Sequence, residues 1–185
     1  WHENQLVPII RNGKLEDVYW TYSYNPIDEP TAPNGIGGVL VVCQETTRLV
    51  MAEQALVDAA QRQQRMFEQA PGFIAILKGA DHVFEFVNNA YIQLVGERDF
   101  IGKSVHQVFP ELEGQGFLEL LNQVYQTGQR HIAQRNPVRL RRRPELPLEL
   151  LHLDFIYAPV MDERGVVTGI FVEGFDSTER VIADQ

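Results

Sequence analysis

The sequence predicts an α+β fold, because its strand-like and helix-like segments are grouped along the chain and do not alternate. Three strand-like runs occupy residues 1–45, one long helical stretch follows at 46–70, and the order strand, strand, helices and three strands fills 71–180. Of the 185 residues, 44% are hydrophobic and 22% are charged, which is typical of globular proteins.

The composition argues against several classes of protein. The net charge of −9 argues against nucleic-acid binding, which requires a basic face, and we expect the one basic cluster, at 139–144, to be a solvated strand edge or loop. No apolar run approaches the ~20 residues that cross a bilayer. The single cysteine, Cys43, fits a reducing compartment. We expect a cytoplasmic fragment of a longer polypeptide that itself makes no membrane contact.

The first two strands are expected to form a hairpin. Segments 5–13 and 16–27 meet around Asn12 and Gly13, the strongest short signal for a two-residue turn, and 39–44 adds a third strand. Alternation along the second strand places several large side chains on one face, which we expect to be buried. These side chains are Val18, Trp20, Tyr22 and Tyr24.

Residues 46–70 contain no glycine or proline and precede Pro71 and Gly72, which indicates one long helix. Apolar side chains recur at spacings of three and four, but the stripe is narrow, so an isolated helix would be only marginally stable. We therefore expect an interface through Leu49, Leu56 and Met66, either with another helix in a coiled coil or with a sheet.

The region 71–180 predicts a complete domain. Two strands, at 73–77 and 82–87, precede a short helix that Asn88 or Asn89 caps and that ends at Gly96. An amphipathic helix follows at 114–129 and ends at Gly128. The last three strands are expected at 130–142, 146–162 and 165–176.

The last three strands repeat the first three. Pro26 corresponds to Pro159, Gly38 to Gly169, and Glu45 to Asp176. An internal repeat of this kind indicates two copies of one structural unit. We therefore expect the first copy to be the back half of a domain, and the second copy to be whole.

The segments PGFIAIL, FEFVNNAY, IGKSVHQVFPEL and DSTER, in this order, resemble the PAS family, specifically the PAS modules of bacterial multidomain sensors. The resemblance implies a five-stranded antiparallel sheet with helices on one face, a pocket between them, and further domains in tandem. It divides the chain into the C-terminal strands of an upstream PAS domain at 1–45, a connecting signalling helix at 46–70, a complete PAS domain at 71–180, and the start of the next linker helix at 181–185.

The DSTER segment is the expected signal-coupling joint, formed by Asp176, Thr178 and Arg180. Asp176 and Arg180 lie four residues apart at a helix start, where they can pair and tie the strand to the next helix. An exposed pair of this kind contributes only ~0–1 kcal/mol. The first copy has no arginine at the matching place, so we expect a looser joint there.

The sequence holds no recognisable catalytic group. None of its five histidines lies three or four residues from another, so we expect no metal site. The resemblance implies that a haem-binding form would carry a histidine on the 114–129 helix and that a flavin-adduct form would carry a cysteine in the helical region. This sequence has neither, and His106 is the fallback haem ligand. We expect no cofactor, and any catalysis would belong to other domains of the parent protein.

The space between sheet and helices can be either a filled core or a pocket for a small molecule. Aromatic residues at these spacings favour a core, whereas a pocket needs convergent polar groups, which Tyr91, Tyr125, Asn89 and Gln123 can supply. The residues expected to line the space are Phe86, Asn89, Tyr91, Leu94, Phe109, Leu121, Val124, Tyr125, Leu153, Phe155 and Tyr157.

Three large apolar residues have the parity opposite to that of the expected core. Ile156, Phe171 and Phe175 should lie on the outer face of the sheet, where apolar side chains need cover. The expected cover is the helix at 46–70, from the same chain or from a partner.

Together these inferences predict a sensory, signal-relay and dimerisation module that binds no nucleic acid. The expected partners are a second copy and the adjacent PAS and output domains of the same polypeptide. The preferred parent is a sensor histidine kinase of a two-component phosphorelay. The alternatives are a diguanylate cyclase or phosphodiesterase, and a structural spacer that binds no ligand.

Overall fold

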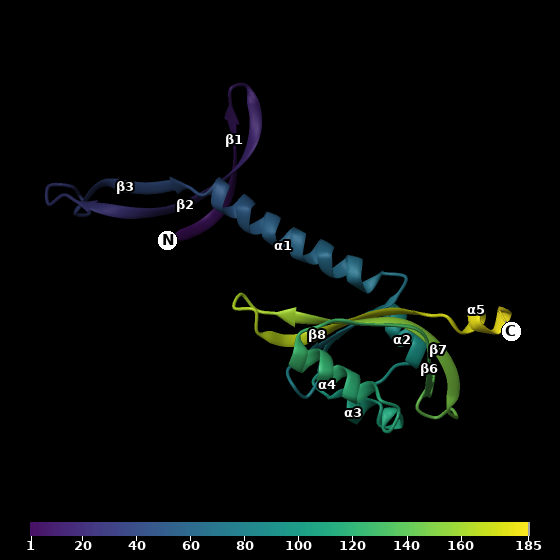
Figure 1. The fold of residues 1–185 in the computed structure, drawn as a ribbon. Coiled ribbons are helices and arrows are strands. Elements are labelled where there is room, and N and C mark those ends of the chain that lie inside the picture. The colour runs from purple at the N-terminus through teal and green to yellow at the C-terminus, as the bar shows by residue number, and fades with distance from the viewer. Residues whose placement is uncertain (185) are drawn as a thin grey trace. The chain divides into compact units, whose positions relative to one another are not determined.

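The computed structural model describes residues 1–184 of the chain. These residues form two compact units, Trp1–Gln63 and a second unit that begins at Gln64, so the boundary falls within helix α1, Thr47–Glu68 (Figure 1). No helix in this part of the chain is long and apolar enough to cross a membrane.

The first unit contains an antiparallel sheet in the order β1-β2-β3, followed by most of α1. The strands are β1 (His2–Arg11), β2 (Lys14–Asp28) and β3 (Ile36–Glu45). Asn12 and Gly13 have φ values of 52° and 77°, which is the left-handed conformation that a two-residue hairpin turn requires. The predicted hairpin is therefore confirmed.

The predicted burial of the aromatic face of β2 is confirmed only at one end. Val18 is 1% exposed, Trp20 and Tyr22 are partly buried, and Tyr24 is 63% exposed. The first unit has no helical layer like the one that buries the sheet of the second unit, so the outer end of this face remains in contact with water.

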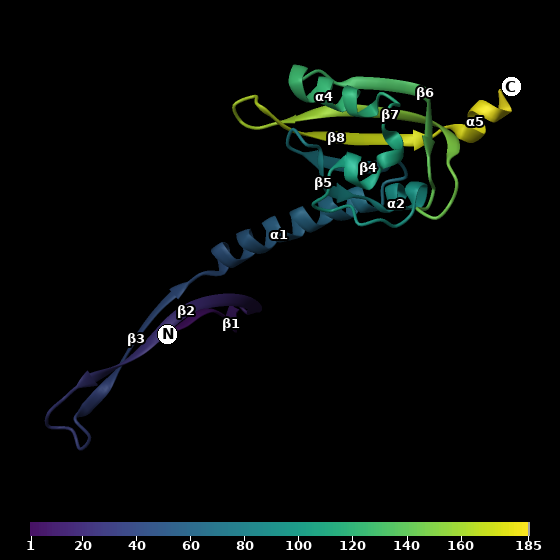
Figure 2. The same ribbon diagram turned by 90° about the horizontal axis from the view of Figure 1, so that it is seen from below.

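The second unit is an antiparallel five-stranded sheet in the order β5-β4-β8-β7-β6 (Figures 1 and 2). Its strands are β4 (Phe73–Lys78), β5 (Val83–Val87), β6 (His131–Leu140), β7 (Glu149–Met161) and β8 (Val167–Asp176). Its helices are α2 (Asn89–Val95), α3 (Val105–Val108), the 3-10 turn η1 (Pro110–Leu112), α4 (Phe117–Thr127) and α5 (Thr178–Ala183).

One face of this sheet packs against α2, α3 and α4. Along β7 the residues Leu151, Leu153, Phe155 and Tyr157 are buried, and they meet Leu94 of α2, Val108 of α3 and Leu121 of α4 in one apolar cluster. The period-two alternation of β7 therefore agrees with the fold. The predicted α+β class, with a five-stranded sheet and helices on one face, is confirmed.

The repeat seen in the sequence is also a repeat of strand pairing. Trp20 lies opposite Glu45 in the first sheet, and their counterparts Leu153 and Asp176 lie opposite each other in the second. Both first strands carry a bulge, which lies between His2 and Gln5 in β1 and between Ala133 and Asn136 in β6. The strands β1, β2 and β3 therefore have the register of β6, β7 and β8.

Candidate functional site

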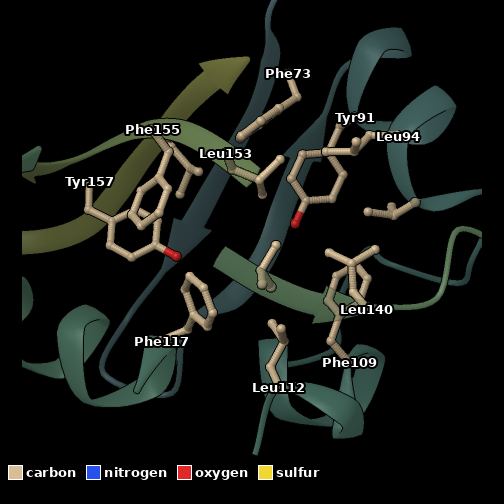
Figure 3. Close-up of a pocket in the computed structure, with 13 residues that line it drawn as sticks. Phe73, Tyr91, Leu94, Phe109, Leu112, Phe117, Leu140, Leu153, Phe155 and Tyr157 are labelled. Carbon is tan, nitrogen blue, oxygen red and sulfur yellow. The ribbon is translucent and has the colours of Figure 1, made fainter. Parts of the chain in front are cut away.

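A cavity of about 60 Å³ lies between the inner face of the sheet and the helices of the second unit. Since a cavity needs only ~10–15 Å³ to hold one water molecule, this space can accept a few waters or one small organic molecule. Figure 3 shows side chains from strands and helices converging on it. The lining residues are Phe73, Tyr91, Leu94, Val95, Phe109, Leu112, Phe117, Val138, Leu140, Leu153, Phe155, Tyr157 and Val172.

Two hydroxyl groups are the polar side-chain atoms of this lining. The hydroxyls of Tyr91, on α2, and Tyr157, on β7, point into the space between the apolar side chains (Figure 3). Burial raises the pKa of Tyr91, and burial together with the nearby Tyr91 raises the pKa of Tyr157. Both hydroxyls are therefore protonated at neutral pH and can donate hydrogen bonds to an acceptor atom in the cavity.

The ring of Tyr91 is fixed by other aromatic rings. Its centroid lies 5.9 Å from that of Phe73, 6.0 Å from Phe84, 5.8 Å from Phe100 and 6.3 Å from Phe109, and all four pairs have edge-to-face geometry. Such pairs add ~0.5–1.5 kcal/mol each beyond simple burial. An occupant that displaces this ring must therefore also disturb the elements that carry its neighbours.

The structure brings six of the predicted pocket residues to the cavity lining. These are Tyr91, Leu94, Phe109, Leu153, Phe155 and Tyr157. Leu121 and Val124 are buried in the same apolar cluster, but they pack between α4 and the sheet and do not line the cavity. Tyr125 lies beside the ring of His82, at 6.0 Å, and Gln123 is exposed.

The predictions for Phe86 and Asn89 are corrected by local backbone geometry. Simple alternation places Phe84 and Phe86 on the same face of β5. A bulge between them sets Phe84 opposite the buried Leu77 and Phe86 opposite Ile76, so Phe84 stays in the core and Phe86 turns to the other face of the sheet. Asn89 is exposed at the first residue of α2, whereas its neighbour Asn88 is 1% exposed.

Asn88 is the site residue whose role was missed in the sequence, where it was predicted only as one of two possible helix caps. Its Oδ1 accepts from the backbone N–H of Tyr91 at 3.0 Å and of Ile74 at 2.8 Å. Its Nδ2 donates to the carbonyls of Phe67 at 3.0 Å and Gly72 at 2.9 Å. One buried side chain thus joins α1, β4 and α2.

Arg98 supports the wall of the cavity from behind. Its guanidinium lies 4.4 Å from the centroid of the Phe109 ring and donates to Glu111 at 3.0 Å. It also donates to the carbonyls of Val95, Val108 and Arg141. Both side chains of the Arg98–Glu111 pair are more than nine-tenths buried, so the pair fixes the end of α2, the helical turns and the end of β6 against one another.

The outer face of the sheet is covered only in part. Phe171 packs on Phe67 of α1, with ring centroids 5.9 Å apart, whereas Ile156 is partly buried and Phe175 is 57% exposed. The expected interface residues of the helix, Leu49, Leu56 and Met66, are 54%, 73% and 68% exposed. Phe67, and not Met66, is therefore the residue of α1 that reaches β8.

The strand-to-helix joint differs from the expected one. The carboxylate of Asp176 pairs with Arg142 at 3.3 Å and caps Thr178 at its backbone N–H, whereas Arg180 is exposed on α5. The expected pair between Asp176 and Arg180 is therefore wrong for this structure. Thr178 Oγ1 accepts from the backbone N–H of His152 at 2.9 Å and holds the start of α5 to β7.

The joint of the first copy is not looser. Thr47 Oγ1 accepts from the backbone N–H of Tyr19 at 2.9 Å, as Thr178 does from His152 in the second copy. The carbonyl of Tyr19 accepts from Thr46 at 2.8 Å, and this bond also has its counterpart in the second copy. The two threonines hold the joint in both places, so a missing arginine does not loosen it.

Residues 1–184 contain no group of three histidine, cysteine, aspartate or glutamate side chains that could hold a metal ion. His106 is exposed on α3 and does not line the cavity. The lining of the cavity itself offers two phenol groups and otherwise hydrocarbon. A lining of this chemistry suits an uncharged ligand.

A family model described as the PAS fold matches residues 67–182. An RNA-binding light-oxygen-voltage receptor is similar in structure, with a TM-score of 0.56 and 18% identity over 89% of this chain and 41% of that chain. The PAS domain of a protein from Colwellia psychrerythraea has a TM-score of 0.52 and 13% identity over 66% of this chain and 99% of that chain.

The Vibrio cholerae VqmA dimer, a LuxR-type receptor with a target DNA, has a TM-score of 0.50 and 22% identity, over 66% of this chain and 55% of that chain. This chain thus spans about half the length of VqmA and of the light-oxygen-voltage receptor. At these identities the likeness is one of fold.

Proposed function

Because this chain belongs to the PAS family, we propose that it is a sensory and signal-relay module of a multidomain bacterial signalling protein. The observation that carries this proposal is the cavity of about 60 Å³ with the hydroxyls of Tyr91 and Tyr157 inside it. A well-packed core has few voids larger than a water molecule. Two phenol donors in such a void suit a small, uncharged and largely apolar ligand that carries one or two hydrogen-bond acceptors.

The proposed domain order is the one that the repeat supports. Residues 1–45 are the last three strands of an upstream PAS domain, 46–70 form the connecting helix, 71–180 form a complete PAS domain, and 181–185 begin the next linker. The identical register of the two three-stranded sheets supports this division. Asp176, Thr178 and Arg180 would carry the signal onward, with Thr178 as the contact that holds strand to helix.

A sensor histidine kinase is the parent that we prefer, and a diguanylate cyclase or phosphodiesterase is the alternative. We also propose a cytoplasmic homodimer, with α1 and the outer face of the sheet as its interface. VqmA, one of the similar structures, is a dimer. With a net charge of −9, this part of the parent is not expected to bind nucleic acid itself.

The proposal is tested by identifying the small molecule that stays bound to the protein when it is purified from cells. We expect that denaturing extraction of purified protein, followed by mass spectrometry, releases one small uncharged compound in stoichiometric amount. The double variant Tyr91→Phe, Tyr157→Phe should lose this compound, because it keeps the rings and removes both donors. The variant Tyr24→Phe, in the first unit, is the matched control and should retain it.

A structural spacer without ligand is the second candidate, and the small volume of the cavity favours it. In that case the wild-type protein releases no compound. Small apolar probes such as 2-butanone would then leave the NMR signals of the residues that line the cavity unchanged at millimolar concentration.

A further inference from the structure

We propose that Asn88 is a positioning residue that transmits occupancy of the cavity to the end of helix α1. This inference rests on the proposed sensory function for the meaning of the occupant. The link itself is built from four hydrogen bonds of one side chain, and all of them lie within the second unit.

The first half of the link connects the cavity to Asn88. Tyr91 presents its hydroxyl to the cavity, and its backbone N–H is bonded to Asn88 Oδ1 at 3.0 Å. Asn88 is also the residue that caps α2, so a shift of Tyr91 moves the first turn of α2 together with its cap. Because Asn88 is 1% exposed, water cannot replace the bonds that such a shift would break.

The second half connects Asn88 to α1. Its Nδ2 reaches the carbonyl of Phe67, in the last turn of α1, which otherwise accepts only a long backbone bond of 3.4 Å from Ala70. The last carbonyls of a helix lack partners within the helix, so a side-chain donor there decides how the helix ends. The rings of Phe67 and Phe171, with centroids 5.9 Å apart, also connect this turn to β8.

The linker between α1 and β4 has little room to move. Asn88 Nδ2 also holds the carbonyl of Gly72, and a side chain on Gly72 would come within 2.7 Å of the carbonyl oxygen of Gly174 on β8. The linker from α1 to β4 is therefore pressed against the end of β8. We therefore expect a movement of Asn88 to displace the last turn of α1 more than this linker.

The test compares Asn88→Asp with Asn89→Asp. The first variant keeps an oxygen that accepts from the backbone N–H groups of Tyr91 and Ile74. It removes both N–H groups of Nδ2, so the hydrogen bonds to the carbonyls of Phe67 and Gly72 are lost. The second introduces the same charge at the adjacent exposed residue. The readout is amide hydrogen exchange at Gln69 and Ala70, whose N–H groups bond back into the last turn of α1. Circular dichroism verifies folding, and Asn88→Ser replaces Asn88→Asp if the buried charge prevents it.

Occupancy is imposed in two ways, by 2-butanone as a probe and by Val138→Leu, which adds one methylene to the lining. We expect either occupant to change exchange at Gln69 and Ala70 at least threefold in the wild type and in Asn89→Asp, and less than 1.5-fold in Asn88→Asp. A merely structural role would shift the starting rate and leave the response intact. The proposal is overturned if Asn88→Asp responds as strongly as the protein with Asn88. It is also overturned if neither 2-butanone nor Val138→Leu changes the exchange rates when Asn88 is present. If the wild type does not bind the probe but Val138→Leu acts through Asn88, the link stands and ligand sensing fails.

Discussion

Asn4 and Arg135 have the same left-handed backbone conformation, with φ values of 50° and 51°, at the same bulge in two copies of one three-stranded sheet. In each copy the backbone N–H of this residue donates to a side chain on the neighbouring strand, Thr21 in the first and Asp154 in the second. A non-glycine residue adopts this conformation only at a cost of ~1–2 kcal/mol. Shared strain at matching positions is hard to explain by chance, and it strengthens the inference that residues 1–45 are half of a second domain.

The first prediction follows from that strain. Asparagine tolerates the left-handed conformation better than arginine, so Arg135→Asn should stabilise the second unit by up to about 1 kcal/mol. Urea unfolding followed by circular dichroism measures the change. Arg135→Lys keeps both the charge opposite Asp184 and the strain, so it should be neutral. A destabilised Arg135→Asn would mean that the exposed ion pair contributes more than the backbone strain costs.

The second prediction concerns alkaline pH. Burial raises the pKa of Tyr91 and Tyr157 in the folded protein, whereas in the unfolded chain both ionise at their ordinary value of ~10. Above that pH the unfolded state binds fewer protons, so stability is fully present below pH ~10 and falls as the pH rises toward the folded values. Absorbance at 295 nm should show both residues ionising only together with unfolding.

The control for this pH dependence uses phenylalanine. Tyr91→Phe and Tyr157→Phe should each reduce the alkaline loss of stability, because each removes one buried group that must ionise. Tyr24→Phe should leave it unchanged, since Tyr24 is 63% exposed in the first unit. Ionisation of Tyr91 or Tyr157 while circular dichroism still reports a folded protein would contradict the buried position of these two hydroxyls.

The third prediction concerns the buried pair behind the cavity wall. Arg98→Ala leaves Glu111 buried without its partner and deprives three carbonyls of a donor, so it should cost about 3–5 kcal/mol of folding free energy. Urea unfolding is the measurement, and Arg139→Ala, at an exposed position, is the control and should cost less than about 0.5 kcal/mol. Equal effects of the two variants would show that the pair is not structural.

The fourth prediction concerns the connecting helix. Leu56 is 73% exposed in the single chain, and its position on the apolar stripe of α1 suits a helix of a second copy. Leu56→Asp should raise the dimer dissociation constant at least tenfold, because the new charge would enter the apolar seam. Sedimentation velocity over a concentration series measures this. Gln61→Asp, away from the stripe, should leave the constant unchanged, and an unchanged mass for both variants would count against a dimer through α1.

The sequence was sufficient for the fold but not for the details of the site. Alternation along β7 and the glycine at the end of α4 predict those elements correctly, because each signal depends on residues close in the chain. Phe86 has the parity of the buried Phe84, and its position on the other face depends on a bulge that is fixed by pairing with β4. The role of Asn88 depends on a carbonyl 21 residues away. Arg142 forms the ion pair with Asp176 because the loop after β6 brings the two side chains together, and no local spacing in the sequence predicts that pair.

The last prediction concerns the free edge of β3. In the second unit β8 pairs with β4, and a side chain added to Gly169 would collide with the carbonyl oxygen of Leu77. Gly38 holds the same position in β3, where an added side chain would meet only Ile27, at 3.7 Å. If β3 belongs to a PAS domain, a strand from outside residues 1–45 should pair with this edge as β4 pairs with β8. We expect a second copy to supply it in the isolated chain.

Cys43 is a built-in probe of that edge, because it is the only cysteine, it is exposed, and it matches Gly174 in the second copy. We expect its reaction with a maleimide to slow at least fivefold between low and high micromolar protein, as the edge becomes covered. Gly38→Ala should abolish this slowing and leave the unfolding of the second unit unchanged, whereas Gly169→Ala should destabilise that unit by about 1–3 kcal/mol. If the labelling rate is independent of concentration, no second copy covers β3, and a Gly38→Ala variant that behaves as the wild type would remove the proposed strand partner altogether.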